Sequence, residues 1–255
     1  MVVGCVALAM TACTSRAVEQ ASPPQTPVLS TSSSQPSTTP SPTPTDSTSS
    51  TPAIPPLGAA ARKAGLLDIR TIVPDAILDL RYATTNNFTH VQLYPSDARC
   101  LVHQSMASGL RTAAARLREE GYRLVFWDCY RPHAVQVHMF KIVPNPEWVA
   151  RPGDYATSHE SARSVDVTLA YAHGTCPTRD HGYCLLDMGT GFDDFTDRAH
   201  AFATSGVSAE AQADRAILRR AMEAGDLTVY TGEWWHFDVA GSKVHRPILD
   251  VPVTG

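Results

Sequence analysis

The stretch TSHESARSVDVTLAY, residues 157–171, decides the fold of the central part of this chain. In its second half, Val165, Val167 and Leu169 alternate with polar residues, which is the period-two pattern of a strand with one face against the core. Asp166 is therefore expected to point away from that face. His159 lies seven residues before Asp166, and the segment between them is short enough to fold back. The two side chains could thus reach one ion.

A second stretch, GEWWH at 232–236, adds another imidazole and a spare carboxylate. A catalytic zinc ion takes three protein ligands and keeps a position for water, and a nearby carboxylate that is not a ligand can accept the proton of that water. His159, Asp166 and His236 have the chemistry of the three ligands. Glu233 has that of the base. The His-to-Asp spacing alone is a weak signal, because two hydrogen-bonded polar residues give the same pattern.

The spacing of Glu233 and His236 sets a condition on the backbone. The composition of this segment is typical of a strand, and on a regular strand residues i and i+3 point to opposite faces. The two side chains can converge only if the chain bends between them. We therefore predict a bulge or turn at Glu233–Trp234, after a strand at 227–230.

The flanking sequence predicts alternating helices and strands, with weak helical signal at 59–63. Pro132 should open a short helix that ends before Pro144, so Arg131 stands at a strand-to-helix junction. Such junctions commonly carry function, although an arginine there is also often a surface residue or an ion-pair partner. The other expected elements are extended segments at 71–74 and 77–82, an amphipathic helix at 105–120 closed by Gly121, a buried strand at 122–128, and a helix at 208–224 capped by Ser208, with an apolar stripe of Ala213, Ile217, Ala221 and Met222.

Length and composition favour one catalytic domain, expected at 58–255. The chain has 255 residues, of which 43% are hydrophobic, enough for a core of ordinary size. Its formal net charge is −4, and it has no cluster of Lys and Arg. A nucleic-acid partner, which would need a basic face or tail, is therefore not expected. No apolar run reaches the roughly 18 to 20 residues of a membrane-spanning helix.

The N-terminal sequence is typical of an exported lipoprotein. Residues 1–13 are apolar and small and end in Thr-Ala-Cys, so Cys13 would be lipidated and become the mature N-terminus. Met10 and the lack of a preceding Lys or Arg depart from that pattern, and the alternative is an apolar terminus without this role. Residues 14–57 form a linker, rich in Ser, Thr and Pro between 22 and 56, that would tether the domain to the membrane over at most about 100 Å. A glycosylated stalk has the same composition.

Four cysteines remain once the export signal and its lipidated cysteine are set aside, and they allow three pairings. An even number in an exported chain indicates disulfides. Cys176 and Cys184 flank a turn-like stretch between two extended runs, so a local bridge across a hairpin is expected there. Cys100 would then pair with Cys129. A cysteine zinc site would need closely spaced pairs, which this sequence lacks.

Five motifs combine these separate signals, and their order resembles that of D-alanyl-D-alanine dipeptidases of the VanX type. The resemblance covers about residues 66–238. Related zinc peptidases include D,D-carboxypeptidases and cell-wall endopeptidases. The motifs are LRYAT at 80–84 with NNF at 86–88, WDCYRP at 127–132, SH at 158–159 with Asp166, MGTGFD at 188–193, and EWWH at 233–236.

The resemblance implies an α+β fold, with a small central antiparallel sheet flanked by helices and a site for one Zn²⁺ per chain on the sheet. It implies zinc-dependent hydrolysis of a small D,D-dipeptide. With the export signal and the linker, the enzyme is expected on the outer side of the membrane, facing the cell wall. The implied roles are zinc ligation by His159, Asp166 and His236, proton transfer by Glu233, oxyanion stabilisation by Arg131, recognition of the substrate ammonium by Tyr82 and Asp193, and recognition of its carboxylate by Thr157 and Ser158.

One position departs from the family pattern. The family usually has glycine three residues after the first histidine, where this chain has Ala162. If that position needs a positive φ, the alanine is strained. Two alternatives to the dipeptidase remain: a D,D-carboxypeptidase or endopeptidase acting on longer wall peptides, and a zinc-containing lipoprotein that binds wall fragments without cleaving them.

Overall fold

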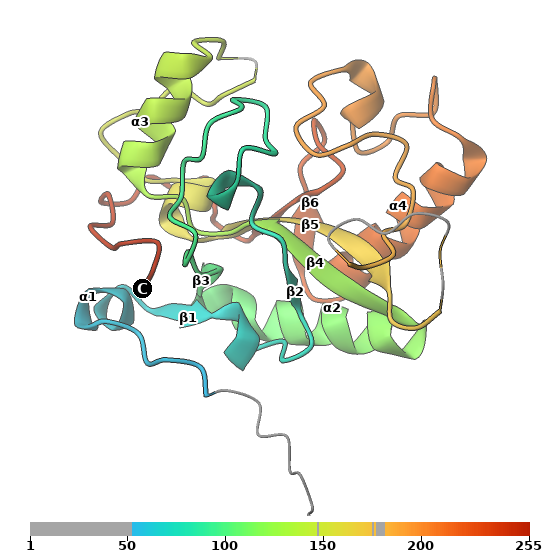
Figure 1. Ribbon diagram of the computed structural model, residues 1–255, viewed down its shortest axis with the longest axis horizontal. Helices are drawn as coiled ribbons and strands as arrows, with labels where there is room; N and C mark the ends of the chain where they lie inside the picture. The colour runs from blue at the N-terminus through green and yellow to red at the C-terminus, as the bar shows by residue number, and fades with distance from the viewer. Residues whose placement is uncertain (1–52, 147, 175, 177–181) are drawn as a thin grey trace, which may run out of the picture. The chain divides into compact units, whose positions relative to one another are not determined.

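The computed structural model describes residues 53–146, 148–174, 176 and 182–255 (Figure 1). The expected export signal at 1–13, with Cys13, and most of the expected linker at 14–57 lie outside the described residues. Within the described ranges, none of the helices is both long and apolar enough to cross a membrane.

A five-stranded sheet forms the centre of the domain, in the order β2-β4-β5-β7-β6 (Figure 1). Three of its four neighbouring pairs are antiparallel, and the edge strand β2 runs parallel to β4. The expected α+β fold with a central antiparallel sheet is thus confirmed, with this one parallel pair as an addition. The strands are β2 (Ile77–Leu78), β4 (Tyr122–Asp128), β5 (Ser164–Tyr171), β6 (Leu227–Val229) and β7 (His236–Val239).

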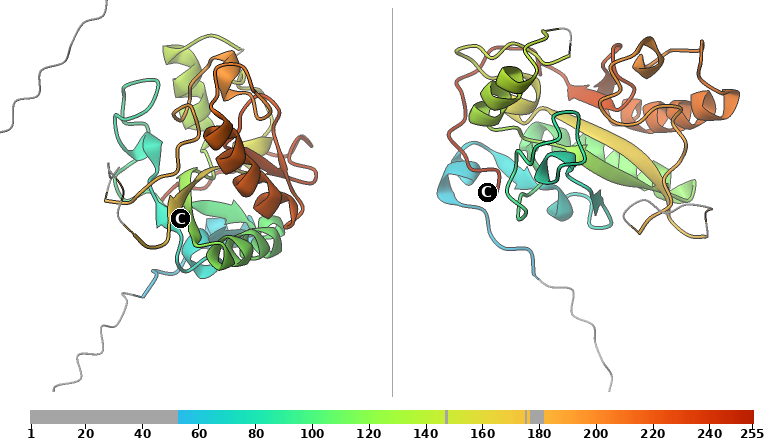
Figure 2. Two further views of the ribbon diagram at one scale, coloured as in Figure 1. Left: turned by 90° about the vertical axis from the view of Figure 1, so that its right-hand side faces the viewer. Right: turned by 45° about the horizontal axis from the view of Figure 1, so that its top comes forward.

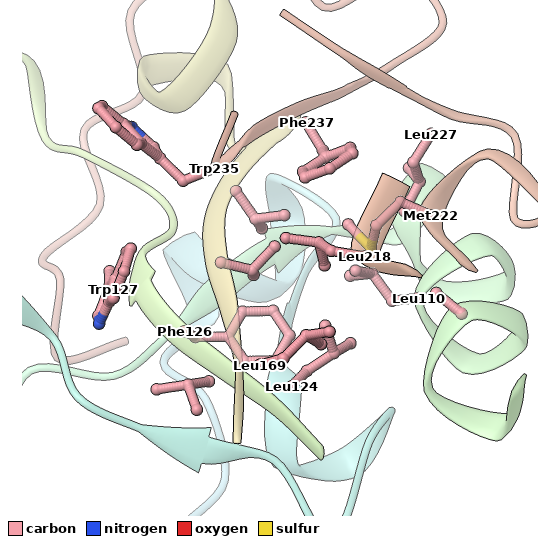
Figure 3. Packing of buried hydrophobic residues seen from close by; sticks show 14 of the residues in the cluster. Leu110, Leu124, Phe126, Trp127, Leu169, Leu218, Met222, Leu227, Trp235 and Phe237 are labelled. Carbon is pink, nitrogen blue, oxygen red and sulfur yellow. The ribbon is translucent and has the colours of Figure 1, made fainter. Parts of the chain in front are cut away.

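Helices α2 (Ala107–Glu119) and α4 (Ala209–Glu223) pack against each other and against the sheet (Figure 2). Their apolar side chains meet those of the strands in the main core (Figure 3). Leu110, Leu169 and Leu218 are completely buried there. This core fixes β5 from one side and leaves its other side to the polar residues Asp166 and Thr168.

The remaining elements surround this sheet. The helix α3 (His133–Ile142) is separated from α2 by strands of the sheet (Figure 1). A second, two-stranded sheet pairs β1 with β3. The other bounds are α1 (Ala59–Lys63), β1 (Leu66–Asp68), β3 (Leu101–His103), and 3₁₀ turns at Ile69–Thr71, Arg81–Ala83, Gln104–Met106, Ser158–Ser161 and Asp197–Ala199.

Most of the predicted elements form within two residues of their expected bounds, but three predictions are wrong. The strand in the extended segment expected at 77–82 ends at Leu78, and Arg81–Ala83 form a 3₁₀ turn in which the Ala83 N–H donates to the Leu80 carbonyl. The extended segment expected at 71–74 is preceded by a 3₁₀ turn that takes in Thr71, because the Asp68 carboxylate caps the turn by accepting from the Arg70 N–H. The apolar stripe of α4 is also shifted. Ala213 is exposed, whereas Arg215 is 3% exposed, because its guanidinium donates to the Met188 carbonyl and lies over the Trp234 ring.

Two disulfides join the four cysteines of the domain. Cys100 is bonded to Cys129 and Cys176 to Cys184, with Cα atoms 5.2 and 5.7 Å apart. Around the second bond, the Tyr171 N–H donates to the Cys184 carbonyl, so the chain returns beside the end of β5 as in a hairpin. The turn itself, residues 177–181, lies outside the described residues.

Candidate metal centre and substrate cavity

The register of the sheet brings the candidate metal ligands together. Asp166 on β5 is paired directly with His236 on β7 and, on its other side, with Asp128 on β4. Directly paired residues present their side chains on the same face. His159 comes from the 3₁₀ turn Ser158–Ser161, which folds back just before β5.

Three ligand atoms converge at this point. His236 Nδ1 lies 3.0 Å from Asp166 Oδ1, and His159 Nε2 lies 3.3 Å from the same oxygen and 3.1 Å from His236 Nδ1. Ligands at about 2.0–2.1 Å from a tetrahedral ion are separated by about 3.3 Å, so the three atoms fit three corners of such a site. These residues are the one group of this kind among the described His, Cys, Asp and Glu side chains.

The far nitrogen of each imidazole has its own acceptor. His159 Nδ1 donates to the Cys129 carbonyl at 2.8 Å, and His236 Nε2 lies 3.1 Å from Asp238 Oδ1. A carbonyl can only accept, so the proton of neutral His159 is held on Nδ1. With both far nitrogens protonated, the two near nitrogens present lone pairs toward Asp166. Metal-binding histidines usually make such a hydrogen bond through the ring nitrogen that does not bind the metal. The residues are therefore suited to hold a metal ion.

The charges of the cluster show the same demand for a cation. Burial raises the pKa of Asp166, but the neighbouring His159 and His236 outweigh it and hold this pKa well below its usual range. Burial lowers the pKa of His236, but hydrogen bonds to Asp166 and Asp238 outweigh this effect and raise this pKa to about 10. The cluster thus places two imidazoles against one buried carboxylate, a donor set suited to a cation.

Glu233 lies beside this group without joining it. Its Oε2 is 3.8 Å from His236 Nδ1, and its side chain is 26% exposed. The predicted bend at Glu233–Trp234 is confirmed: the Glu233 N–H donates to the Tyr230 carbonyl, and β7 begins only at His236. Burial raises the pKa of the Glu233 carboxyl above its ordinary value, and Asp166 adds to the rise. A carboxylate made more basic in this way is suited to accept a proton.

Arg131 lies at the expected strand-to-helix junction and is tightly held. Its Nη2 and Nε donate to Asp128 Oδ2 at 2.7 and 3.1 Å, and its Nη1 donates to Gln136. Burial lowers the pKa of Arg131, but the buried Asp128 carboxylate outweighs this effect and raises it well above its usual value. Arg131 is thus a fixed cation at the cavity, as electrostatic stabilisation of a developing negative charge requires.

These groups line a cavity of about 360 Å³. At one side, the Tyr82 hydroxyl donates to Asp193 Oδ2 at 2.9 Å, and the Tyr82 ring lies 5.2 Å from the Arg131 guanidinium. Burial raises the pKa of Asp193 well above its usual value, and Asp166 and Glu233 add to the effect. A cationic group placed there would stabilise the charged form of the Asp193 carboxylate. Thr157 and Ser158 also line the cavity.

Aromatic side chains form an apolar part of the cavity lining. The Phe195 ring is stacked on Trp148 with centroids 5.0 Å apart and meets the edge of Phe88 at 5.2 Å. All three line the cavity. These three rings give the cavity an apolar surface in addition to its charged groups.

Ala162 has a left-handed backbone conformation, which is the strained case for a residue other than glycine. Its φ is +57° and its ψ +29°, and its side chain is fully buried. The left-handed conformation costs a non-glycine residue roughly 1 kcal/mol or more. Its N–H donates to the His159 carbonyl, so this turn helps to place the first histidine.

Several residues of the site were not assigned a role from the sequence. Asp128 stood inside a quoted motif, three residues before Arg131. Asp238 follows His236 by two residues on one strand, so both point to the same face, which is a signal that the sequence contains. Glu160 accepts a short contact from His133 Nδ1, 2.6 Å away, and Lys243 lies beyond β7. The spacing of these residues in the sequence does not predict that Glu160 and Lys243 lie at the site.

Comparison with known proteins finds a matching family, several similar sequences and a solved structure with a weaker likeness. A model of the peptidase M15 family, described as D-ala-D-ala dipeptidase, matches residues 62–254. The chain is 33% identical over 185 residues to the D-alanyl-D-alanine dipeptidase of Escherichia coli K12, covering 72% of this chain and 90% of that protein. It is 28% identical to that of Enterococcus faecium, covering 74% and 98%. A solved LdcB LD-carboxypeptidase aligns with a TM-score of 0.40 and 18% identity over 70% of this chain and 69% of that one.

The family match spans most of the chain and includes all of the residues that line the cavity. The most similar of these relatives is aligned over nine-tenths of its own length. The chain therefore belongs to the D-Ala-D-Ala dipeptidase family of M15 peptidases and is a metallopeptidase.

Proposed function

We propose that this metallopeptidase uses one Zn²⁺ to hydrolyse D-alanyl-D-alanine, or a similar D,D-dipeptide, to free amino acids. The observation that carries the proposal is one small cavity that combines a three-ligand metal group, an unligated carboxylate, a fixed arginine and a carboxylate able to bind an ammonium. The names of the relatives support the choice of substrate.

His159, Asp166 and His236 would hold the ion through Nε2, Oδ1 and Nδ1. When bound, zinc supplies Lewis acidity and lowers the pKa of a coordinated water molecule. Two histidines and one carboxylate are a known catalytic ligand set for zinc, which favours this metal over hard cations that prefer all-oxygen sites.

Glu233 would accept a proton from the attacking water and deliver it to the leaving amine. Its raised pKa suits both transfers, since a base must bind the proton and an acid must release it near neutral pH. Arg131 would stabilise the negative oxygen of the tetrahedral intermediate. Because Asp128 and Gln136 hold its guanidinium in advance, it needs little reorganisation during the reaction.

The ammonium end of the substrate would lie at Asp193. The Tyr82 hydroxyl donates to this carboxylate and holds it in place. A longer chain has a neutral amide in place of the ammonium, so it cannot form this ion pair with Asp193. This arrangement favours a dipeptide over the longer peptides of a carboxypeptidase or endopeptidase.

We also propose that the enzyme is exported and tethered to the outer face of the membrane through lipidated Cys13 and the 14–57 linker. The composition of residues 1–57 supports this. Metabolic labelling with a fatty acid, compared between the wild type and Cys13→Ala, tests it. Labelling of both proteins, or of neither, would contradict the proposal.

The activity is tested by a hydrolysis panel of D-Ala-D-Ala, its N-acetyl derivative and a pentapeptide stem, each with and without a chelator. We expect turnover of the free dipeptide, loss with the chelator and recovery on adding Zn²⁺. Preference for the pentapeptide over the free dipeptide would instead indicate the carboxypeptidase. Full activity in the chelator would contradict a metal-dependent mechanism.

A further inference from the structure

The Lys and Arg side chains that line the cavity, within the described part of the chain, are Arg131 and Lys243. They differ in how they are held. The Arg131 guanidinium is 12% exposed and makes two hydrogen bonds to Asp128 and one to Gln136. The Lys243 side chain is 63% exposed and makes one ion pair, to Asp238. Arg131 is thus held in place by its hydrogen bonds, whereas the Lys243 ammonium has N–H donors that can bind a ligand.

The backbone places Lys243 beside Thr157 and Ser158. The Ser158 N–H donates to the carbonyl of Ser242, the residue just before Lys243, at 2.9 Å. The Lys243 ammonium lies 3.0 Å from Asp238 Oδ2 and 5.3 Å from the centre of the Tyr230 ring. Tyr230, Thr157 and Ser158 all line the same cavity.

Lys243 and Asp193 are connected to the rest of the site through different residues. Asp238, the partner of Lys243, contacts Nε2 of His236, which is the nitrogen turned away from Asp166. Asp193 is instead bonded to Tyr82, whose ring lies against Arg131. A free dipeptide carries one ammonium and one carboxylate, and the cavity offers a carboxylate on the Tyr82 side and a cation on the Ser158 side.

We propose that Lys243 binds the C-terminal carboxylate of the substrate and thereby determines specificity for peptides with a free terminal acid. The inference rests on the proposed function, which it deepens. An ammonium has three donors, so Lys243 can keep its bond to Asp238 and still donate to the substrate. The Tyr230 ring below it supports the charge through a cation–π contact.

The test compares D-Ala-D-Ala with D-Ala-D-alaninamide, and the pentapeptide stem with its C-terminal amide, in the wild type, Lys243→Gln and Lys243→Arg. For Lys243→Gln we expect KM for the acids to rise about 5- to 10-fold, with kcat almost unchanged, because the contact is partly exposed. KM for the amides should not change. Lys243→Arg should restore most of the affinity for the acids. Lys63→Gln, at the end of α1, makes the same charge change away from the cavity and should leave every value unchanged.

Three outcomes would overturn the inference: an equal loss on acids and amides, no loss on either, or a fall in kcat together with weaker zinc binding. The last result would mean that Lys243 acts only through Asp238 on His236. Absence of turnover by the wild type on every acid would contradict the proposed function itself. Wild-type turnover with an unchanged ratio of acid to amide in Lys243→Gln would contradict only the role of Lys243.

Discussion

The two ends of strand β5 differ sharply, although both are buried and each lies near a disulfide. At the beginning of the strand, Ser164 and Asp166 are polar and are 0% and 3% exposed. Toward its end, Leu169 and Ala170 are apolar and fully buried, and Ala170 is bridged to Leu185 of the returning chain. The first end holds a candidate metal ligand, Asp166, whereas the second end only packs into the core.

This difference shows how one strand serves two purposes. Buried polar groups cost stability unless each finds a partner, and at the first end they do: Ser164 donates to Asp238, and Asp166 contacts both histidines. The apolar end gains stability from burial alone. Changes at the first end should therefore alter chemistry, and changes at the second should alter stability.

The largest effect is expected for Glu233→Gln. The amide cannot take up the proton of the attacking water, so kcat should fall about 10²- to 10⁴-fold. Zinc content and melting temperature should stay as in the wild type, because Glu233 is not a ligand. Glu223→Gln, on the exposed surface of α4, is the matched control. Full hydrolysis by zinc-loaded Glu233→Gln protein would exclude Glu233 as the base.

A smaller effect is expected for Asp238→Asn, which weakens the acceptor of the His236 Nε2 proton. Removal of such outer partners typically lowers metal affinity or activity about 10- to 100-fold. We expect this loss in zinc affinity, measured by competition with a chromophoric chelator. Asp97→Asn serves as the exposed control. An unchanged zinc affinity would show that the near nitrogen of His236 needs no support from Asp238.

The two disulfides provide a direct comparison of stability. In the chain-entropy model, bonds that span 29 and 8 residues stabilise the fold by about 3.6 and 2.5 kcal/mol. Replacing Cys100 and Cys129 by alanine should therefore cost more unfolding free energy in urea than replacing Cys176 and Cys184.

Only the first replacement should also lower activity, since the Cys129 carbonyl holds His159. Activity assays at a temperature where both variants are folded separate this effect from stability. Equal activity losses in the two variants would contradict the distinction between the two ends of β5.

The smallest effect is expected for Ala162→Gly. Glycine relieves roughly 1 kcal/mol of left-handed strain, but it adds conformational freedom to the unfolded chain and removes a buried methyl group. These terms nearly cancel, so the free energy of unfolding should change by less than about 1 kcal/mol, with activity kept. Chemical denaturation measures this. A large fall in kcat would mean that the alanine side chain itself shapes the turn that carries His159.

Much of the local structure follows from short-range patterns in the sequence. Ser208 caps α4, the bend before His236 forms as its spacing to Glu233 required, and residues 122–128 form a buried strand. The two misplaced extended segments failed for local reasons, because 3₁₀ turns take in Thr71 and Arg81–Ala83. The shifted stripe of α4 has a long-range cause. Arg215 lies in what looked like a polar face of α4, because the Met188 and His200 carbonyls, distant in sequence, accept its hydrogen bonds.

The sequence by itself determined the two long helices, the buried strands β4 and β5, the bend at Glu233 and the set of reactive groups, because these depend on periodicity and on the chemistry of single residues. Only the tertiary structure decided how those groups face one another. The register of three strands aligns Asp128, Asp166 and His236, and the acceptor that fixes the proton of His159 is a carbonyl 30 residues away. Such partners depend on how distant segments pack, and no local pattern in the sequence encodes that.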